Sequence, residues 1–196
     1  MRLVTSAVIA VVLSAFNAAA ADVDRGAQLY REGKYGEAAT ELRRAVEQDG
    51  SNARAHRYLG LALVEQEKLE DAARHLAKAD EIAPSGETKT ALARLYIEQK
   101  DYDKAEATLK DASGEDVEYV RGLLHFHRKD FEAAVTQFEN HLKTRPENAY
   151  AHYYAGMAYS GIQRPDKMLT HFELFLKARP DAPEARKVRA VLRTVR

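Results

Sequence analysis

Apolar residues recur at helical spacing in paired runs along most of the chain. The clearest first run is Ala55, Leu59, Ala62 and Leu63, and its partner run is Leu69, Ala72, Ala73, Leu76, Ala79 and Ile82. Steps of three and four residues place such side chains on one face of a helix. A polar break at 66–68 separates the runs, and Pro84 follows the second, where proline stops a helix. The pattern predicts two helices joined by a short turn.

This paired pattern occurs five times along the chain. The predicted helix pairs are 23–33 with 36–48, 52–66 with 69–82, 86–98 with 102–111, 115–128 with 131–144, and 148–161 with 165–178, and a single helix follows at 182–194. Equivalent anchor residues in the second helices are Ala38, Ala72, Ala105, Ala134 and Met168, at separations of 34, 33, 29 and 34 residues. A period near 34 built from two helices is typical of a helix-turn-helix repeat array.

Small residues occupy one equivalent place in every first helix, namely Gly26, Gly60, Ala93, Gly122 and Gly156. Because glycine inside a helix costs about 1 kcal/mol relative to alanine, we expect the facing helix to approach too closely for a side chain. The prediction is an all-α fold, a right-handed α-solenoid of about five helix-turn-helix repeats with a C-terminal capping helix. The short interval of 29 residues predicts a third repeat that ends near residues 112–114, where two half-arrays meet with an altered twist.

The second repeat carries a specific set of residues: His56, Leu59-Gly60, Leu63, Ala72, Leu76, Ala79 and Pro84. This set resembles the pattern of tetratricopeptide repeat proteins, and the order of the segments resembles the exported bacterial kind. The resemblance covers roughly residues 22–180. It implies repeats at about 22–52, 53–85, 86–114, 115–148 and 149–181, which together form an array over 22–181, and a capping helix over 182–196. The resemblance also implies a scaffold for protein interactions.

The amino terminus has the features of a secretory signal peptide. Met1-Arg2 is followed by a mostly apolar stretch from Leu3 to Phe16 and by small residues at 18–21. We expect residues 1–21 to be removed after Ala20 or Ala21 and the protein to reach the periplasm. The alternative is an uncleaved segment that anchors the chain to the inner membrane, although its apolar run is shorter than the roughly 20 residues that span a bilayer.

Composition and motifs exclude several classes of function. Thirty basic residues balance 30 acidic ones, which argues against nucleic-acid binding, and the absence of cysteine removes disulfides and thiol chemistry. Four of the seven histidines, His56, His75, His152 and His171, fall at two shared places in the repeats. Because no catalytic, phosphate-binding or metal-binding motif is present, we expect no enzyme activity, no cofactor and no metal site.

The remaining candidate is the surface of the first helices, which line the concave side of such arrays. Residues three or four apart share a helix face, and the stripe left free by the core defines a predicted peptide-binding groove. Its members are Arg54, Arg57, Leu61, Val64, Arg94, Ile97, Tyr119, Leu123, Phe126, His127, Tyr150, Tyr153 and Met157. We expect it to be cationic in its amino-terminal half and aromatic in the other, and to hold a peptide through buried apolar anchors and arginine-bound carboxylates.

Two alternatives stay open for these features. The tyrosines and phenylalanines also suit a role as filler between neighbouring helices, and the helix at 182–194 could cover part of the stripe. That helix carries Arg186, Lys187, Arg189, Arg193 and Arg196, so it either caps the last repeat or makes a peripheral contact with anionic lipid.

The function that we expect from the sequence is a non-catalytic scaffold that binds a protein or peptide segment of unknown identity, as a monomer, and assists assembly of envelope complexes. The alternative is a self-assembling structural protein of the cell envelope.

Overall fold

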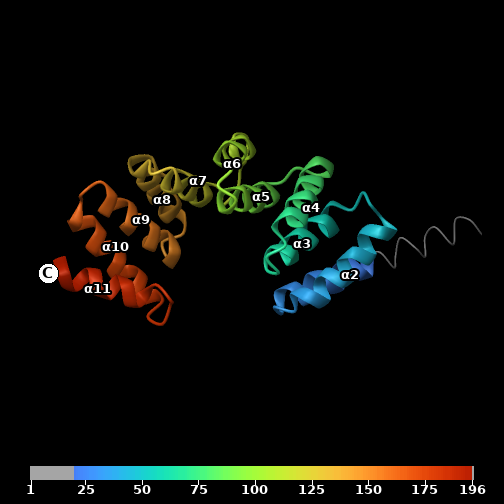
Figure 1. Cartoon of the computed structure of the whole chain (residues 1–196), viewed down its shortest axis with the longest axis horizontal. Coiled ribbons are helices and arrows are strands. Elements are labelled where there is room, and N and C mark those ends of the chain that lie inside the picture. Colours follow the sequence, from blue (N-terminus) through green and yellow to red (C-terminus); the bar gives the residue numbers. More distant parts are fainter. Residues whose placement is uncertain (1–19, 196) are drawn as a thin grey trace, which may run out of the picture. The chain divides into compact units, whose positions relative to one another are not determined.

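A computed structural model describes residues 20–195, and every regular element in that range is an α-helix (Figure 1). The first helix covers residues 20–31 of the described part, and the others are α2 (Tyr35–Gln48), α3 (Ala53–Val64), α4 (Leu69–Ile82), α5 (Gly86–Glu98), α6 (Tyr102–Leu109), α7 (Val117–His127), α8 (Phe131–Thr144), α9 (Ala149–Gly161), α10 (Pro165–Ala178) and α11 (Ala185–Val195). These bounds follow the predicted pairs closely, so the all-α prediction is confirmed. None of these helices is long and apolar enough to cross a membrane.

The turn inside each helix pair is built in the same way. A residue with positive φ ends the turn at Gly33, Glu67, Lys100, Lys129 and Gln163. The backbone N–H of the next residue reaches back five positions, as from Lys68 to the carbonyl of Leu63 at 2.9 Å. This pattern satisfies carbonyl groups at the end of the first helix. It reverses the chain tightly, and the second helix then packs against the first.

The small residues of the first helices lie against the second helices, as the sequence predicts. A β-carbon built on Gly60 would lie 2.6 Å from Cγ of Leu76, and one on Gly156 would lie 2.6 Å from Cδ1 of Phe172. Real β-carbons do not approach other atoms so closely, and the glycine is what lets the two helices meet. The absence of a side chain therefore allows the close approach in the pairs that carry a glycine at this place, and Ala93 takes that place in the third pair.

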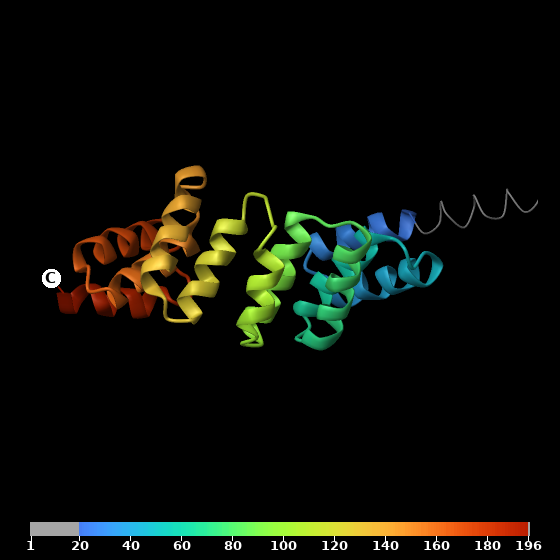
Figure 2. The ribbon, with the colours of Figure 1, turned by 90° about the horizontal axis from the view of Figure 1, so that it is seen from above.

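The chain forms two compact units, which divide between Leu95 and Tyr96 inside α5. The sequence predicted a change of twist near residues 112–114, whereas the division into units falls earlier, within a helix. The N-terminal unit (described from residue 20) contains the first helix, α2, α3, α4 and most of α5. The C-terminal unit contains the remaining helices, among which α7 to α10 pack in sequence (Figure 2). Stacked helix pairs within each unit are the local arrangement of an α-solenoid, which confirms the predicted fold class.

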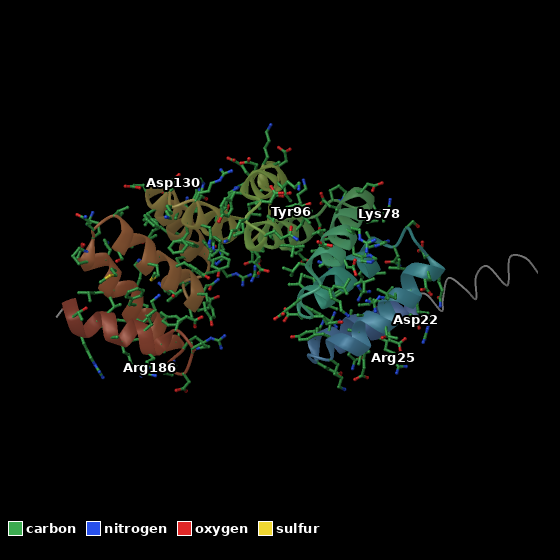
Figure 3. The ribbon with its side chains drawn as sticks, in the orientation of Figure 1. Asp22, Arg25, Lys78, Tyr96, Asp130 and Arg186 are labelled. Carbon is green, nitrogen blue, oxygen red and sulfur yellow. The ribbon has the colours of Figure 1, made fainter. Side chains whose placement is uncertain are left out.

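The core of the C-terminal unit ends at α11. Phe172 and Phe175 of α10 are buried together with Val188 and Leu192 of α11. The apolar face of α11 is thus used for packing, and its exposed face carries charged residues such as Arg186 (Figure 3). Contact with lipid through this helix would have to use the polar face alone. The predicted signal peptide, residues 1–21, lies almost wholly outside the described residues.

Candidate peptide-binding surface

First helices of neighbouring repeats are joined by side-chain contacts within each unit. In the N-terminal unit, Nη1 of Arg54 in α3 lies 2.6 Å from Oδ1 of Asp24 in the first helix, and Arg57 in α3 pairs with Glu87 in α5. In the C-terminal unit, the ring of Phe126 in α7 lies 5.4 Å from that of Tyr154 in α9. Side chains of the first helices are therefore linked from one repeat to the next within each unit.

Arginine side chains surround Tyr58 in the N-terminal unit. The guanidinium carbons of Arg31, Arg54 and Arg57 lie 5.9, 5.7 and 5.1 Å from the centre of the Tyr58 ring. Contacts of this kind are favourable because the ring face is electron-rich. The sequence predicted Arg54 and Arg57 but missed Arg31 and Tyr58, since Tyr58 lies one position beyond the stripe.

The positive charge of this arginine cluster is partly neutralised within the unit. Asp24 pairs with Arg54 and Glu87 pairs with Arg57, and their side chains are 68% and 77% exposed. Exposed pairs of this kind contribute little to stability. A carboxylate from a binding partner could replace Asp24 or Glu87 at small cost, so these pairs leave the cluster able to bind an anionic group.

The other predicted residues of the N-terminal unit differ in exposure. Leu61 and Val64 are half-buried on α3, and Arg94 is exposed on α5. Burial raises the pKa of the Tyr30 hydroxyl, while the charge of Arg94 opposes that effect. Tyr30 thus stays a neutral aromatic side chain beside Tyr58, with ring centres 5.9 Å apart.

The C-terminal unit presents a row of half-buried rings, which we call the aromatic surface: Tyr119, Phe126, Tyr150, Tyr153 and Tyr154. Tyr154 is its centre, with ring centres 6.5 Å from Tyr119, 5.4 Å from Phe126 and 5.2 Å from Tyr153. Tyr154 also stacks on the buried ring of Phe138 at 6.0 Å. The sequence missed Tyr154, because it directly follows Tyr153 and so falls outside a stripe drawn through positions three or four apart.

Two rings of the aromatic surface pack on the core of the last repeat. Tyr153 lies 5.2 Å from Phe175, and Tyr150 lies 6.0 Å from the same ring. The hydroxyl of Tyr150 donates a hydrogen bond of 3.3 Å to Glu184, just before α11. Met157 packs against the same core and is half-buried. The segment at 182–194 therefore borders this surface, while Tyr150 and Tyr153 keep part of their area exposed.

Two predicted groove residues belong to the interior. Ile97 and Leu123 are only 5% and 7% exposed, so they support the first helices rather than offer contact area. His127, at the end of α7, is exposed beside Phe126, with ring centres 5.6 Å apart. Among the described residues, no group of three or more acidic or histidine side chains is arranged to hold a metal ion.

Comparison with known proteins decides the family. The sequence matches the family described as "Tetratricopeptide repeat" over residues 23–87, 90–143 and 119–183. The chain belongs to the tetratricopeptide repeat family. The sequence prediction of this family is therefore confirmed. No curated protein sequence matches the chain.

Solved structures of other proteins share the tetratricopeptide repeat fold. A Pseudomonas aeruginosa pilF structure is 20% identical, with a TM-score of 0.78 over 93% of this chain and 88% of that one. MamA from AMB-1 is 21% identical, with a TM-score of 0.62 over 84% and 93%. YrrB, described as "a TPR protein with an unusual peptide-binding site", is 20% identical, with a TM-score of 0.61 over 86% and 90%. At these identities the likeness concerns the fold.

Proposed function

We propose that this tetratricopeptide repeat protein is a non-catalytic scaffold that binds a protein or peptide segment on its first helices. The observation that carries the proposal is the aromatic surface, where Tyr119, Phe126 and Tyr153 remain half-buried beside a packed core. Partly exposed aromatic side chains on a rigid support bury a large area at low entropic cost, and they are frequent hot spots in interfaces.

Each unit offers its own kind of contact to a partner. Apolar side chains of a partner would pack between the rings of the aromatic surface, where tyrosine hydroxyls can also donate hydrogen bonds. A carboxylate of a partner would replace Asp24 or Glu87 at the arginine cluster, because guanidinium groups bind carboxylates in a planar, two-pronged geometry. The aromatic surface thus favours segments with aromatic or aliphatic anchors, and the arginine cluster favours acidic groups.

Selection from a random peptide library tests this proposal. The full chain beginning at Asp22 is immobilised, and binders are selected against it after removal of peptides that also bind a Tyr119→Ser, Phe126→Ser, Tyr153→Ser variant checked for helicity. We expect enriched peptides with aromatic or aliphatic anchors. If no sequence is enriched once the peptides that bind the variant have been removed, the aromatic surface is refuted as a binding site.

We also propose that the mature protein acts in the periplasm, in the assembly of an envelope complex. Support comes from the start of the folded part: Asp22 accepts a hydrogen bond of 3.1 Å from Gln48, and Val23 is buried. Ala20 and Ala21 are exposed, so cleavage after either residue would leave these contacts intact. Sequencing the amino terminus of the exported protein tests the cleavage, and a terminus at Met1 would contradict it.

The scaffold proposal further expects a monomer when the protein is purified alone. Light scattering measured over a wide range of concentrations distinguishes this from a self-assembling structural protein. A mass that stays at one chain supports the scaffold, whereas a mass that grows with concentration supports self-assembly.

A further inference from the structure

Two histidine pairs occupy equivalent places in the two units. His56 and His75 lie in the second repeat, and His152 and His171 lie 96 residues further along the chain. In the first pair the two Nδ1 atoms are 2.9 Å apart, and in the second they are 3.0 Å apart. The same arrangement thus occurs twice, but the side chains around the two pairs differ.

Both hydrogen bonds of the His56–His75 pair can form when the two rings are neutral. Nε2 of His56 lies 3.2 Å from the carbonyl oxygen of Gly50, which can only accept, so this nitrogen carries a proton. Nδ1 of His56 is then the acceptor, and Nδ1 of His75 donates to it. These two hydrogen bonds need two protons, and two neutral imidazoles supply two.

The C-terminal pair continues into a longer hydrogen-bonded chain. Nε2 of His152 donates to the carbonyl oxygen of Pro146 at 2.9 Å, so His152 accepts from Nδ1 of His171. Nε2 of His171 lies 3.0 Å from Oε1 of Glu139 in α8. The hydroxyl of Tyr159 donates to the same oxygen at 3.0 Å. We call Pro146, His152, His171 and Glu139 the proton chain.

The proton chain needs one proton more than two neutral imidazoles contain. The proton chain contains three hydrogen bonds, and each needs one proton. It ends at the carbonyl oxygen of Pro146 and at the carboxylate of Glu139, and neither group supplies a proton when Glu139 is ionised. An imidazole is a stronger base than a carboxylate. When a third proton is bound, it belongs on Nε2 of His171, where it makes the contact with Glu139 an ion pair.

The N-terminal pair has no such carboxylate at the equivalent place. Arg43 stands 96 residues before Glu139, and Leu63 stands 96 residues before Tyr159. A further proton on the His56–His75 pair would add charge near Arg43 without gaining an ion pair. In both pairs, a proton on the accepting Nδ1 would set two N–H groups against each other.

We propose that the proton chain is a proton-binding site of the C-terminal unit, which fills on acidification before the His56–His75 pair takes up a proton. The two units then respond to acid in sequence. The first proton taken up by the proton chain forms the His171–Glu139 ion pair. The next proton binds the accepting Nδ1 of His152 and breaks its contact with His171. Because the proton chain joins α8, α9 and α10, the second step loosens the helices behind the aromatic surface.

The charged groups around the two pairs differ, and the carboxylate hydrogen-bonded to His171 is what favours this order. The groups that face the N-terminal pair are Arg43 of α2, Asp71 and Arg74 of α4, and Asp49, which precedes α3. The groups that face the C-terminal pair are Glu139 of α8, Tyr159 of α9 and Lys167 of α10. Burial lowers the pKa of both His75 and His171. For His171, the charge and hydrogen bond of Glu139 oppose burial and the charges of His152 and Lys167 add to it; for His75, the charges of His56, Arg74 and Arg43 add to burial and that of Asp71 opposes it.

Long-range proton–nitrogen NMR spectra of the full chain test the proposal, because they show which ring nitrogens carry a proton. Signals are assigned with single His→Gln variants, and spectra are recorded from about pH 8 to about pH 5, the range of imidazole titration. We expect His171 to gain its second proton at a higher pH than His75. Simultaneous uptake, or uptake by His75 first, would overturn the proposal.

Variants that change the charge beside each histidine pair test the cause of this order. Glu139→Gln should lower the midpoint of His171 by about one pH unit, since it removes an adjacent negative charge, and should leave His75 unchanged. Arg43→Glu should raise the midpoint of His75 by a similar amount. Tyr159→Phe keeps the carboxylate, so the order of uptake should persist. If Glu139→Gln fails to fold, Arg43→Glu decides, and an unmoved His75 midpoint would contradict the inference.

Discussion

Gly122 of α7 faces the ring of Phe138 in α8 so closely that a β-carbon on the glycine would stand 2.5 Å from Cε1 of that ring. The same relationship joins Gly60 to Leu76 and Gly156 to Phe172. In each pair a large side chain of the second helix fills the space that the glycine leaves open. This contact determines how closely the two helices of one repeat pack, and so it fixes where the first helix stands relative to the second.

Substitution of Gly60 by leucine should therefore destabilise the fold. The new side chain would overlap Leu76 and approach the carbonyl oxygen of Ala72, 3.2 Å from the position of the β-carbon. Ala72→Leu should act in the same way, because Ala72 is fully buried. We expect each to lower the free energy of unfolding by about 1–3 kcal/mol, as overpacked cores do, measured by urea denaturation.

Gly36→Ala is the matched control for that experiment. Gly36 lies in α2, and no atom lies within 4 Å of the place where its β-carbon would be. We expect no loss of stability, or a gain of up to about 1 kcal/mol from helix propensity. An equal loss in Gly36→Ala and Gly60→Leu would show that close packing is not the reason why glycine recurs at this place along the array.

Asn148 and Asn52 offer a second comparison between equivalent residues. Each caps its helix, since Oδ1 accepts from Ala151 N at 3.1 Å and from Ala55 N at 3.0 Å, respectively. Asn148 alone of these two also donates from Nδ2 to Nε2 of the buried His141, at 2.9 Å. The place of His141 is taken in the first repeat by Ala45.

We expect Asn52→Ala to cost about 1 kcal/mol, the usual value of a lost cap. Asn148→Ala should cost more, by about 1–3 kcal/mol, because it also leaves a buried ring nitrogen without a partner. Thermal unfolding of both variants measures the difference. Equal losses would mean that the contact between Asn148 and His141 contributes nothing.

The stability of the protein should fall as the pH drops below about 6.5, the ordinary pKa of histidine. Burial lowers the pKa of His75, His141 and His171 in the folded state. Between the folded and unfolded pKa values the unfolded chain binds more protons, so acid favours unfolding. The stabilising effect is fully present above about pH 6.5 and is lost as the pH falls through the lowered values.

Urea denaturation at about pH 7.5 and at about pH 5.5 checks this expectation, since ordinary carboxylates titrate below that window. A His141→Gln variant serves as a comparison and should show a smaller dependence on pH. A free energy of unfolding that is constant or higher at the acidic pH would contradict it.

The sequence predicted the helices and the close contact at the glycines because both depend on local periodicity and on residue size. Gly60 and Leu76 show this: each recurs at a fixed place in the repeat, so their contact follows from the fold class. The turns were likewise predictable, although the positive φ of Glu67 was not, since that residue type gives no signal for it.

The candidate site was only partly predictable. Leu123 shares a helix stripe with Tyr119 but is buried, because the width of the exposed face depends on how neighbouring helices pack. The pairing of Arg57 with Glu87 joins residues of different repeats, which a stripe drawn on one helix does not show. The histidine pairs were visible as shared positions, but only the structure brings their rings together.

The central claim is that a polypeptide binds to the aromatic surface of the C-terminal unit. Titration calorimetry of one library-selected peptide with the wild type, Tyr153→Ser and Leu174→Ser tests it most directly. Leu174 lies on α10, is 40% exposed and is not part of that surface, so its variant removes an exposed apolar side chain elsewhere. We expect Tyr153→Ser to weaken binding by at least about tenfold, as hot-spot residues do, and Leu174→Ser to leave it unchanged. Equal weakening by both variants, or by neither while both stay folded, would contradict the account.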